Sequence, residues 1–278
     1  MKKTIALLLV LVMVLSLCAC GGGKKYYGEY NTVADGKLTV ATSPDYAPYE
    51  FYAIDENGEP QLAGFDLALA AYIADYLGLE LEIVPMDFDG VLAELQTGSV
   101  DLGLAGLSPD PDREEAMDFS DLYYLGGQSF VCLESNKALF PDLAAANNAD
   151  YAIGAQTGSI QYGLAEENTP DAEIIALTKV TDIIQELLTG KLDGAFIETA
   201  VAESYKQNYP DLCVVLPVPY DEAGSAVGVR EGSKELLAAV NEAIAAALAD
   251  GSMDSFVAEA NELAAGEKHE GLLEDYKG

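Results

Sequence analysis

The sequence predicts an α/β protein with two similarly built lobes and largely parallel sheets, on the strength of two observations. From Lys37 onward, short apolar runs alternate with amphipathic segments of helical length, a pattern typical of α/β folds. In addition, residues 94–105 and 186–197 share one arrangement: a helix that closes on Thr-Gly, an aspartate at the turn, and an apolar strand. The two aspartates, Asp101 and Asp193, are 92 residues apart (193 minus 101). This offset is too long for a solenoid repeat and suits two lobes.

The elements follow from the same periodicities. Short apolar runs predict strands at residues 37–42, 79–84, 101–105, 129–133, 151–155, 173–177, 194–197 and 212–216. Amphipathic segments predict helices at residues 66–76, 89–97, 159–167, 181–189 and 200–207, and two alanine- and leucine-rich helices at 233–249 and 253–264. Residues 24–36 are polar and glycine-containing, which favours a linker.

The start of the chain is typical of a lipoprotein secretion signal. An apolar run at residues 5–15 follows two lysines, and it is shorter than the ~20 apolar residues of a membrane-spanning helix. Leu17-Cys18-Ala19-Cys20 resembles a lipobox, in which cleavage precedes a cysteine that carries diacylglycerol. Small Ala19 precedes Cys20, whereas bulky Leu17 precedes Cys18, so Cys20 is the expected lipidation site. The alternative is an ordinary signal peptide with two incidental cysteines.

Composition excludes some functions. Cleavage before Cys20 leaves 259 residues (278 minus 19) and removes two lysines, so that the formal charge changes from −33 to −35. A general binder of nucleic-acid phosphates gains its affinity from Lys and Arg, so this class is excluded. Strong like charge opposes self-association, and we expect a monomer. We expect Cys132 and Cys213 to be buried free thiols, with one disulfide as the alternative.

Candidate binding residues follow the repeated strands, because ligands bind beyond the carboxyl ends of strands in open parallel sheets. Gly106, Ser108 and Arg113 follow the first repeated strand. A guanidinium matches a carboxylate in two parallel hydrogen bonds, and a serine hydroxyl can bind the same anion. The alternative is that Arg113 pairs locally with Asp112 or Glu114.

In the second half, Ser159 follows Gly158 at the start of a predicted helix, where free N–H groups can bind an anion. Glu198 ends the second repeated strand and can accept hydrogen bonds from an ammonium group. Tyr46 and Phe88 follow two strands of the first half and can flank a ligand side chain. The alternatives are a plain helix cap, a solvated surface acid and packing aromatics. No metal or other cofactor is expected, because residues 87–90 lack the spaced oxygen ligands of a calcium loop.

These motifs together resemble one family. The stretch at residues 85–124, with its Met-Asp-Phe-Asp-Gly segment, Leu-Gln-Thr-Gly-Ser-Val-Asp-Leu-Gly-Leu-Ala-Gly-Leu-Ser and Arg113, closely resembles the bacterial extracellular solute-binding protein family 3, nearest to glutamine-binding proteins of amino-acid importers. The resemblance runs from about residue 37 to 264. It implies a type II periplasmic-binding-protein-like fold, whose two lobes are joined by two hinge crossings and close on ligand. The implied organisation is a signal peptide at 1–19, a lipidated cysteine and linker at 20–36, lobe 1 at 37–126 and 222–278, and lobe 2 at 127–221.

The resemblance also implies a role for each candidate residue. Arg113 grips the α-carboxylate of an amino acid, and Ser108 contacts both its carboxylate and its ammonium group. The Gly106 carbonyl and Glu198 bind the ammonium group, where the family usually has Asp in place of Glu. The family's Gly-Thr pair appears as Gly158-Ser159, and its aromatic pair as Tyr46 and Phe88.

Specificity is predicted from three further positions. Glutamine-type relatives place an Asp, a Lys and a His around the ligand side chain, and this chain has Ser43, Gln156 and Ile197 there. A buried charged side chain needs a charged partner, so we expect a neutral amino acid, with glutamine-like polar side chains disfavoured.

The expected function is capture of a free amino acid by lobe closure and its delivery to an ABC permease at the outer face of the cytoplasmic membrane. The expected protein is not an enzyme. One alternative is a dehydratase on the same fold, although the single histidine, His269, lies in the polar tail. The other is a ligand-sensing lipoprotein, although no membrane-spanning or signalling segment is expected after Ala264.

Overall fold

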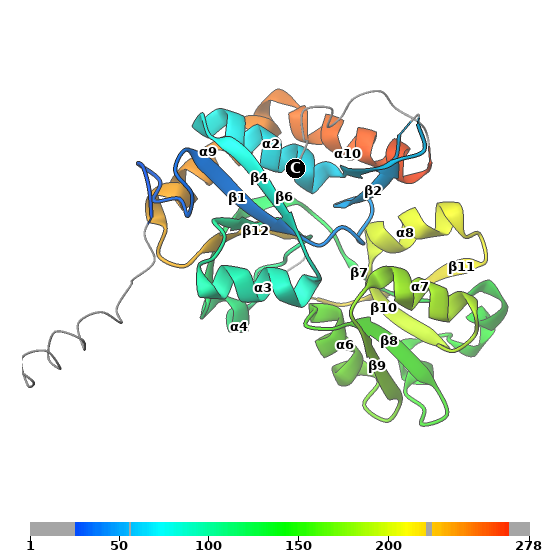
Figure 1. Ribbon diagram of the computed structural model, residues 1–278. Helices are drawn as coiled ribbons and strands as arrows, with labels where there is room; N and C mark the ends of the chain where they lie inside the picture. The colour runs from blue at the N-terminus through cyan, green and yellow to red at the C-terminus, as the bar shows by residue number, and fades with distance from the viewer. Residues whose placement is uncertain (1–25, 56, 221–223, 267–278) are drawn as a thin grey trace, which may run out of the picture.

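The computed structural model describes residues 26–55, 57–220 and 224–266, which form two lobes, each around a five-stranded sheet (Figure 1). The lipidation site predicted at Cys20 lies outside the described residues. The lobe 1 sheet contains β1 (Lys37–Thr42), β4 (Glu80–Pro85), β5 (Leu102–Gly103), β6 (Met117–Tyr124) and β12 (Ser225–Arg230). The lobe 2 sheet contains β7 (Gln128–Leu133), β8 (Ala152–Gln156), β9 (Glu173–Leu177), β10 (Gly194–Glu198) and β11 (Leu212–Val218).

The two sheets have the same topology. The strand order is β4-β1-β5-β12-β6 in lobe 1 and β9-β8-β10-β7-β11 in lobe 2. In each sheet the first three strands are parallel, and the last two add antiparallel. The chain crosses between the lobes after β6 and again after β11. The two-lobed α/β fold predicted from the sequence is therefore confirmed.

Helices cover both faces of the lobe 1 sheet, with α2 and α9 on one face and α3 on the other (Figure 1). The lobe 1 helices are α2 (Phe65–Leu77), α3 (Phe88–Thr97), α4 (Pro111–Glu114), α9 (Lys234–Asp250) and α10 (Ser252–Ala264). The lobe 2 helices are η1 (Glu134–Leu139), α5 (Leu143–Ala146), α6 (Ile160–Asn168), α7 (Val180–Leu188) and α8 (Thr199–Asn208). Within the described part of the chain, no helix taken alone is long and apolar enough to span a membrane; α9 and α10 meet that criterion only as a joined pair bent by 78°.

The repeated sequence motif corresponds to repeated structure. The Asp101 N–H donates to the Thr39 carbonyl in β1, and the Thr39 N–H donates to the Asp101 carboxylate at 3.0 Å. The Asp193 backbone and carboxylate make the same pair of bonds to Ala152 at the start of β8, with 2.9 Å to the carboxylate. The aspartate of each motif therefore binds the equivalent strand of its own sheet, β1 in lobe 1 and β8 in lobe 2.

Two strands of lobe 1 and one hairpin were not predicted. The strands β6 and β12 lie in regions for which no strand or helix was predicted, and they pair antiparallel with each other. The sequence of β6 alternates acids with aromatics (Met-Asp-Phe-Ser-Asp-Leu-Tyr-Tyr) rather than forming an apolar run. The strands β2 (Phe51–Ile54) and β3 (Pro60–Ala63) form a separate hairpin.

The described part of the predicted linker is packed against lobe 1, so the linker prediction is wrong for this part. The Arg230 guanidinium stacks 3.8 Å from the centre of the Tyr26 ring and donates to the Asn31 carbonyl. Thr32 is 2% exposed, and the Val33 N–H donates to Asp101 at 2.9 Å. The polar composition of this segment concealed these contacts, which it makes with residues far away in the sequence.

Candidate ligand-binding site

A small cavity lies between the lobes at the carboxyl ends of their parallel strands. Lobe 1 contributes Tyr46, Phe88, Ala105, Gly106, Ser108 and Arg113, and lobe 2 contributes Gln156, Ile160 and Gln161. Six of these nine were predicted from the sequence: Tyr46, Phe88, Gly106, Ser108, Arg113 and Gln156. The space open to the centre of a water molecule is about 10 Å³, about enough for one water. The lobes are therefore closed over this cavity, and a molecule larger than water can enter it only when they separate.

Arg113 joins the two lobes at the edge of the cavity. Its Nη1 donates to the Ser108 carbonyl at 3.1 Å, and its Nη2 donates across the cleft to the Gly158 carbonyl at 3.2 Å. The guanidinium carbon lies 5.6 Å from the centre of the Phe88 ring. Burial lowers the pKa of Arg113, and nearby Asp110 opposes this shift. The local pairing with Asp112 or Glu114 weighed from the sequence is not among its described contacts.

Gly106 is fixed by a buried carboxylate and by a neighbouring ring. Its N–H donates to Asp66 at 2.9 Å, and Asp66 also accepts from the Tyr123 hydroxyl at 2.7 Å. Burial raises the pKa of Asp66 to about 6. Gly106 has a φ of 56°, in the left-handed region that favours glycine. A Cβ at this position would lie 2.8 Å from Cε1 of Tyr46, so only glycine fits beside this aromatic ring.

Tyr46 is held in the cleft by a lobe 2 side chain. The Gln161 Nε2 donates to the Tyr46 hydroxyl at 3.1 Å and to the Gln128 Oε1 at 2.8 Å. Tyr46 and Phe88 are each 7% exposed and come from the ends of neighbouring strands. The two aromatics predicted to flank a ligand therefore both line the cavity.

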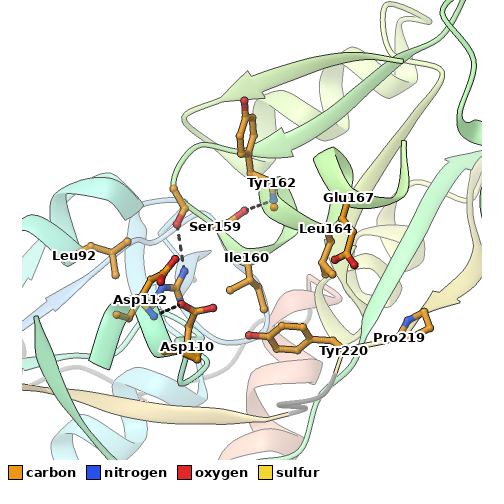
Figure 2. Close-up of a pocket in the computed structure, with 14 residues that line it drawn as sticks. Leu92, Asp110, Asp112, Ser159, Ile160, Tyr162, Leu164, Glu167, Pro219 and Tyr220 are labelled. Carbon is orange, nitrogen blue, oxygen red and sulfur yellow. Dashed lines mark hydrogen bonds between the residues drawn. The ribbon is translucent and has the colours of Figure 1, made fainter. Parts of the chain in front are cut away.

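A larger open groove of about 860 Å³ leads outward from the cavity, and the two share Arg113 and Ile160 (Figure 2). Ser159 lines this groove rather than the cavity. Its hydroxyl accepts from the Tyr162 N–H, as in an N-cap of α6. Asp110, Asp112 and Glu167 make the groove acidic.

Among the described residues, Ser43 and Glu198 line neither the cavity nor the groove. The Glu198 carboxylate accepts from the Val201 N–H at 2.9 Å, which caps α8, and from the Gly127 N–H at 3.3 Å on the first crossing between the lobes. It is 4% exposed, so the alternative of a solvated surface acid is wrong. Burial raises the pKa of Glu198 to about 7, against the backbone N–H groups, which lower it.

Sequence reasoning missed Gln161, which lines the cavity, and Asp45, which lies outside the lining and contacts the lining residue Gln156. Gln161 lies in the first turn of α6, two residues after the predicted Ser159. Asp45 lies between the predicted Ser43 and Tyr46 and is 9% exposed. Its carboxylate accepts from the Ser43 hydroxyl at 2.8 Å and from Gln156 at 3.3 Å. The only sequence signal for either residue was its position after a predicted strand.

Metal-ligating side chains do not gather at the site. Across residues 26–55, 57–220 and 224–266, no group of three or more His, Cys, Asp or Glu side chains could hold a metal ion. Cys132 and Cys213 are buried, as predicted, and lie opposite each other on β7 and β11 as free thiols.

A two-lobed fold whose interlobe cavity is lined by an arginine, a serine, a glycine and two aromatics is consistent with a solute-binding protein. A family model for bacterial extracellular solute-binding proteins, family 3, matches residues 38–259. The chain therefore belongs to this family.

Three relatives show the range of the family. The arginine-binding extracellular protein ArtP of Bacillus subtilis is 33% identical over 249 residues, 88% of this chain and 92% of that protein. The crystal structure of an amino-acid ABC transporter substrate-binding protein, AbpA of Streptococcus pneumoniae, bound to L-arginine, matches with a TM-score of 0.79 and 35% identity, covering 84% of this chain and 97% of that one. Cyclohexadienyl dehydratase of Pseudomonas aeruginosa is 29% identical over 69% of this chain and 70% of the enzyme.

Proposed function

We propose that this protein is the lipid-anchored substrate-binding component of an amino-acid ABC importer, and that it captures a free α-amino acid between its lobes. The observation that supports the proposal most is the convergence of Arg113, Ser108, Gly106 and two aromatics on one interlobe cavity. The names of ArtP and AbpA support the same class of ligand and transporter.

The ligand backbone would be held mainly by lobe 1. A guanidinium has five N–H donors, and the two carbonyl contacts of Arg113 use two of them. The remaining donors can bind the α-carboxylate in a bidentate pair. The Gly106 carbonyl lies on the same strand end and can accept from the ammonium group. Glu198 would reach the ammonium only after giving up its contact with Gly127, and such a rearrangement accompanies lobe opening in this proposal.

We further propose a neutral side chain for the ligand, with glutamine, which the sequence disfavoured, as the first candidate because of the position of Gln156. Gln156 lines the cavity and offers an amide oxygen that can accept from a ligand amide. The Asp45 carboxylate already accepts three hydrogen bonds, from Ser43, Gln156 and Val180. A cation in the ligand would have to compete with these donors for it.

A basic side chain is the second candidate, and Asp45 is the observation that favours it. This buried carboxylate was absent from the reasoning that predicted a neutral ligand. Burial raises the pKa of Asp45, and the hydrogen bond from Ser43 lowers it, so a ligand guanidinium beside the carboxylate would favour its charged form. ArtP and AbpA both carry arginine in their descriptions.

A thermal-shift screen of the twenty amino acids tests the function and separates these two candidates. A ligand that binds only the folded state raises the melting temperature by mass action. Glutamine should give the largest shift if the ligand is neutral, and arginine or lysine should do so if it is basic. A screen without any shift at millimolar amino acid, followed by calorimetry without heat, would remove the proposed function.

An enzymatic function is disfavoured by the position of Glu198. General acid–base catalysis needs a titratable group within reach of the substrate, and Glu198 has a pKa raised to about 7. Its oxygens, however, bind backbone N–H groups outside the cavity lining. Incubation of the protein with prephenate-like acids should give no absorbance change. The likeness to cyclohexadienyl dehydratase makes this the control reaction to run.

The lipid anchor completes the proposal and rests on the sequence around Cys20. A single acyl chain binds membranes weakly, whereas the two chains of diacylglycerol hold a protein stably at the outer face of the cytoplasmic membrane. Mass spectrometry of the protein from its native membrane should show the diacylglycerol mass on Cys20. Release of unmodified protein that begins at another residue would contradict this part of the proposal.

A further inference from the structure

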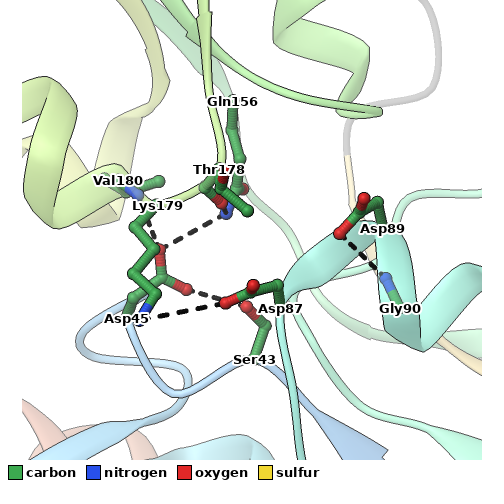
Figure 3. A network of polar contacts seen from close by, with 9 residues as sticks. All are labelled: Ser43, Asp45, Asp87, Asp89, Gly90, Gln156, Thr178, Lys179 and Val180. Carbon is green, nitrogen blue, oxygen red and sulfur yellow. Dashed lines mark hydrogen bonds and ion pairs between the residues drawn. The ribbon is translucent and has the colours of Figure 1, made fainter.

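Asp45 is the lobe 1 residue on which contacts from several lobe 2 elements converge (Figure 3). It follows β1 in a tight turn, in which its own N–H donates to the Ser43 carbonyl at 2.8 Å. The Ser43 hydroxyl donates to its Oδ1, also at 2.8 Å. Its side chain is therefore fixed from within lobe 1 and directed at lobe 2.

Three elements of lobe 2 meet this one residue. The Val180 N–H, at the start of α7, donates to Oδ2 at 2.6 Å. The Gln156 Nε2, at the end of β8, donates to the same oxygen at 3.3 Å. The Tyr205 hydroxyl, on α8, donates to the Asp45 carbonyl at 2.9 Å.

Helix α7 lacks a cap of its own. The first N–H groups of a helix have no partner within the helix, and a side-chain oxygen at the N-cap normally satisfies one of them. The N-cap of α7 is Lys179, which has no acceptor and makes no capping hydrogen bond. The N–H of the first helical residue, Val180, instead finds its acceptor in the opposite lobe. Closure of the lobes therefore completes this helix.

We propose that Asp45 is a latch that caps α7 from the opposite lobe and holds the lobes closed even without ligand. Opening the lobes breaks a charge-assisted hydrogen bond, and such bonds are stronger than neutral ones. Asp45 is thus a positioning residue: it sets the balance between open and closed lobes, and through that balance it sets the rate of ligand release. The second part rests on the proposed function.

The neighbouring ion pair between the lobes is a natural control. The Lys179 ammonium lies 3.9 Å from the Asp87 carboxylate, and both side chains are about half exposed (Figure 3). Exposed ion pairs contribute little, so the closed state should depend on Asp45 and not on Asp87. The variants Asp45→Ala and Asp87→Ala each remove one lobe 1 carboxylate that contacts lobe 2 across the cleft.

Amide hydrogen exchange on the ligand-free full chain in detergent tests the latch directly. Overlapping peptides that contain Val180 report the contact, and small-angle X-ray scattering reports lobe separation. Asp45→Ala should accelerate exchange at Val180 by about 10- to 100-fold, the range for loss of a hydrogen bond to a charged group, and should increase the radius of gyration. Asp87→Ala should change neither quantity. Asp45→Asn keeps a side-chain oxygen as acceptor but loses the charge, so its exchange rate at Val180 should lie between those of the wild type and Asp45→Ala.

The proposal is overturned if Val180 exchanges as fast in the wild type as in Asp45→Ala, or if both proteins scatter identically. Should Asp45→Ala fail to fold, Gln156→Ala serves in its place, because it removes one donor to the same oxygen and should give a smaller change in the same direction. These readouts need no ligand. If no amino acid binds but Asp45→Ala still opens the lobes, the proposed function fails and the latch stands.

Discussion

Replacing Gly106 by alanine perturbs the cavity at a point where both the backbone and a neighbouring ring oppose a methyl group. The φ of 56° requires the left-handed region, which costs an L-residue about 1–2 kcal/mol. The new Cβ would lie 2.8 Å from Cε1 of Tyr46. That ring is buried and packs 5.5 Å from the Tyr49 ring, so relieving the crowding should cost a further ~1–3 kcal/mol. The expected loss of unfolding free energy is about 2–5 kcal/mol.

Two other glycines separate these contributions. Gly78, at the end of α2, has a φ of 66° with nothing within 4 Å of an added Cβ, so Gly78→Ala reports the backbone cost alone. Gly163, inside α6, has neither restriction, and Gly163→Ala should stabilise the protein by about 0.5–1 kcal/mol.

Urea unfolding of the three variants, followed by circular dichroism, measures the differences in midpoint. The expected order of stability is Gly163→Ala above wild type, then Gly78→Ala, then Gly106→Ala. Gly106→Ala should also weaken amino-acid binding, because the displaced ring and carbonyl belong to the cavity. Equal destabilisation by Gly106→Ala and Gly78→Ala would refute the close packing of Tyr46 on Gly106.

Three further predictions concern other residues. Arg113→Ala should weaken amino-acid binding by about 100-fold, since it removes a charge-assisted bidentate pair, and calorimetry with an unchanged circular dichroism spectrum checks this; near-native affinity would remove Arg113 from the site. Because burial raises the pKa of Asp66 from 3.8 to about 6, the folded state holds this proton more tightly than the unfolded chain. The contribution of Asp66 to stability should therefore be greatest below about pH 4 and fall by ~3 kcal/mol as the pH rises through 6. Urea midpoints between pH 4 and 7 should show this contribution as the difference between the wild type and Asp66→Asn. Burial raises the pKa of Cys132 to about 12 and also that of Cys213, so a thiol reagent at pH 8 should label both only after unfolding; absence of labelling in denaturant would instead indicate a disulfide.

The sequence predicted most strands and helices of the two lobes because these elements depend on local patterns of residues. The Thr-Gly-x-x-Asp motifs predicted matched strands, and Gly98 and Gly190 indeed adopt left-handed φ values of 64° and 71° after their helices. The packed residues 26–34 could not be predicted in this way. Their partners, Asp101 and Arg230, are far away in the sequence, and nothing local distinguishes such a segment from a linker.

The candidate binding residues divide along the same line. Arg113, Ser108 and Gly106 were found because they follow a recognisable strand within one specific motif. Gln161 could not be found, because its partner Tyr46 meets it only when the two lobes close, and its other partner, Gln128, is 33 residues away in the sequence. Contacts between the lobes depend on the tertiary arrangement, which one sequence does not report.

Asp45 shows why ligand specificity was the weakest prediction. Ser43, Gln156 and Ile197 stand where glutamine-type relatives have an Asp, a Lys and a His, and this difference predicted a neutral ligand. A comparison of single positions does not detect an acid that lies two residues further along the turn. The Asp45 carboxylate nevertheless lies next to position 43, because the Ser43 hydroxyl donates a hydrogen bond to it. Whether this carboxylate serves the ligand or the helix α7 then depends on competition for its oxygens. A basic ligand that binds tightly would have to draw Asp45 from Val180, so binding of arginine and capping of α7 should compete for this carboxylate.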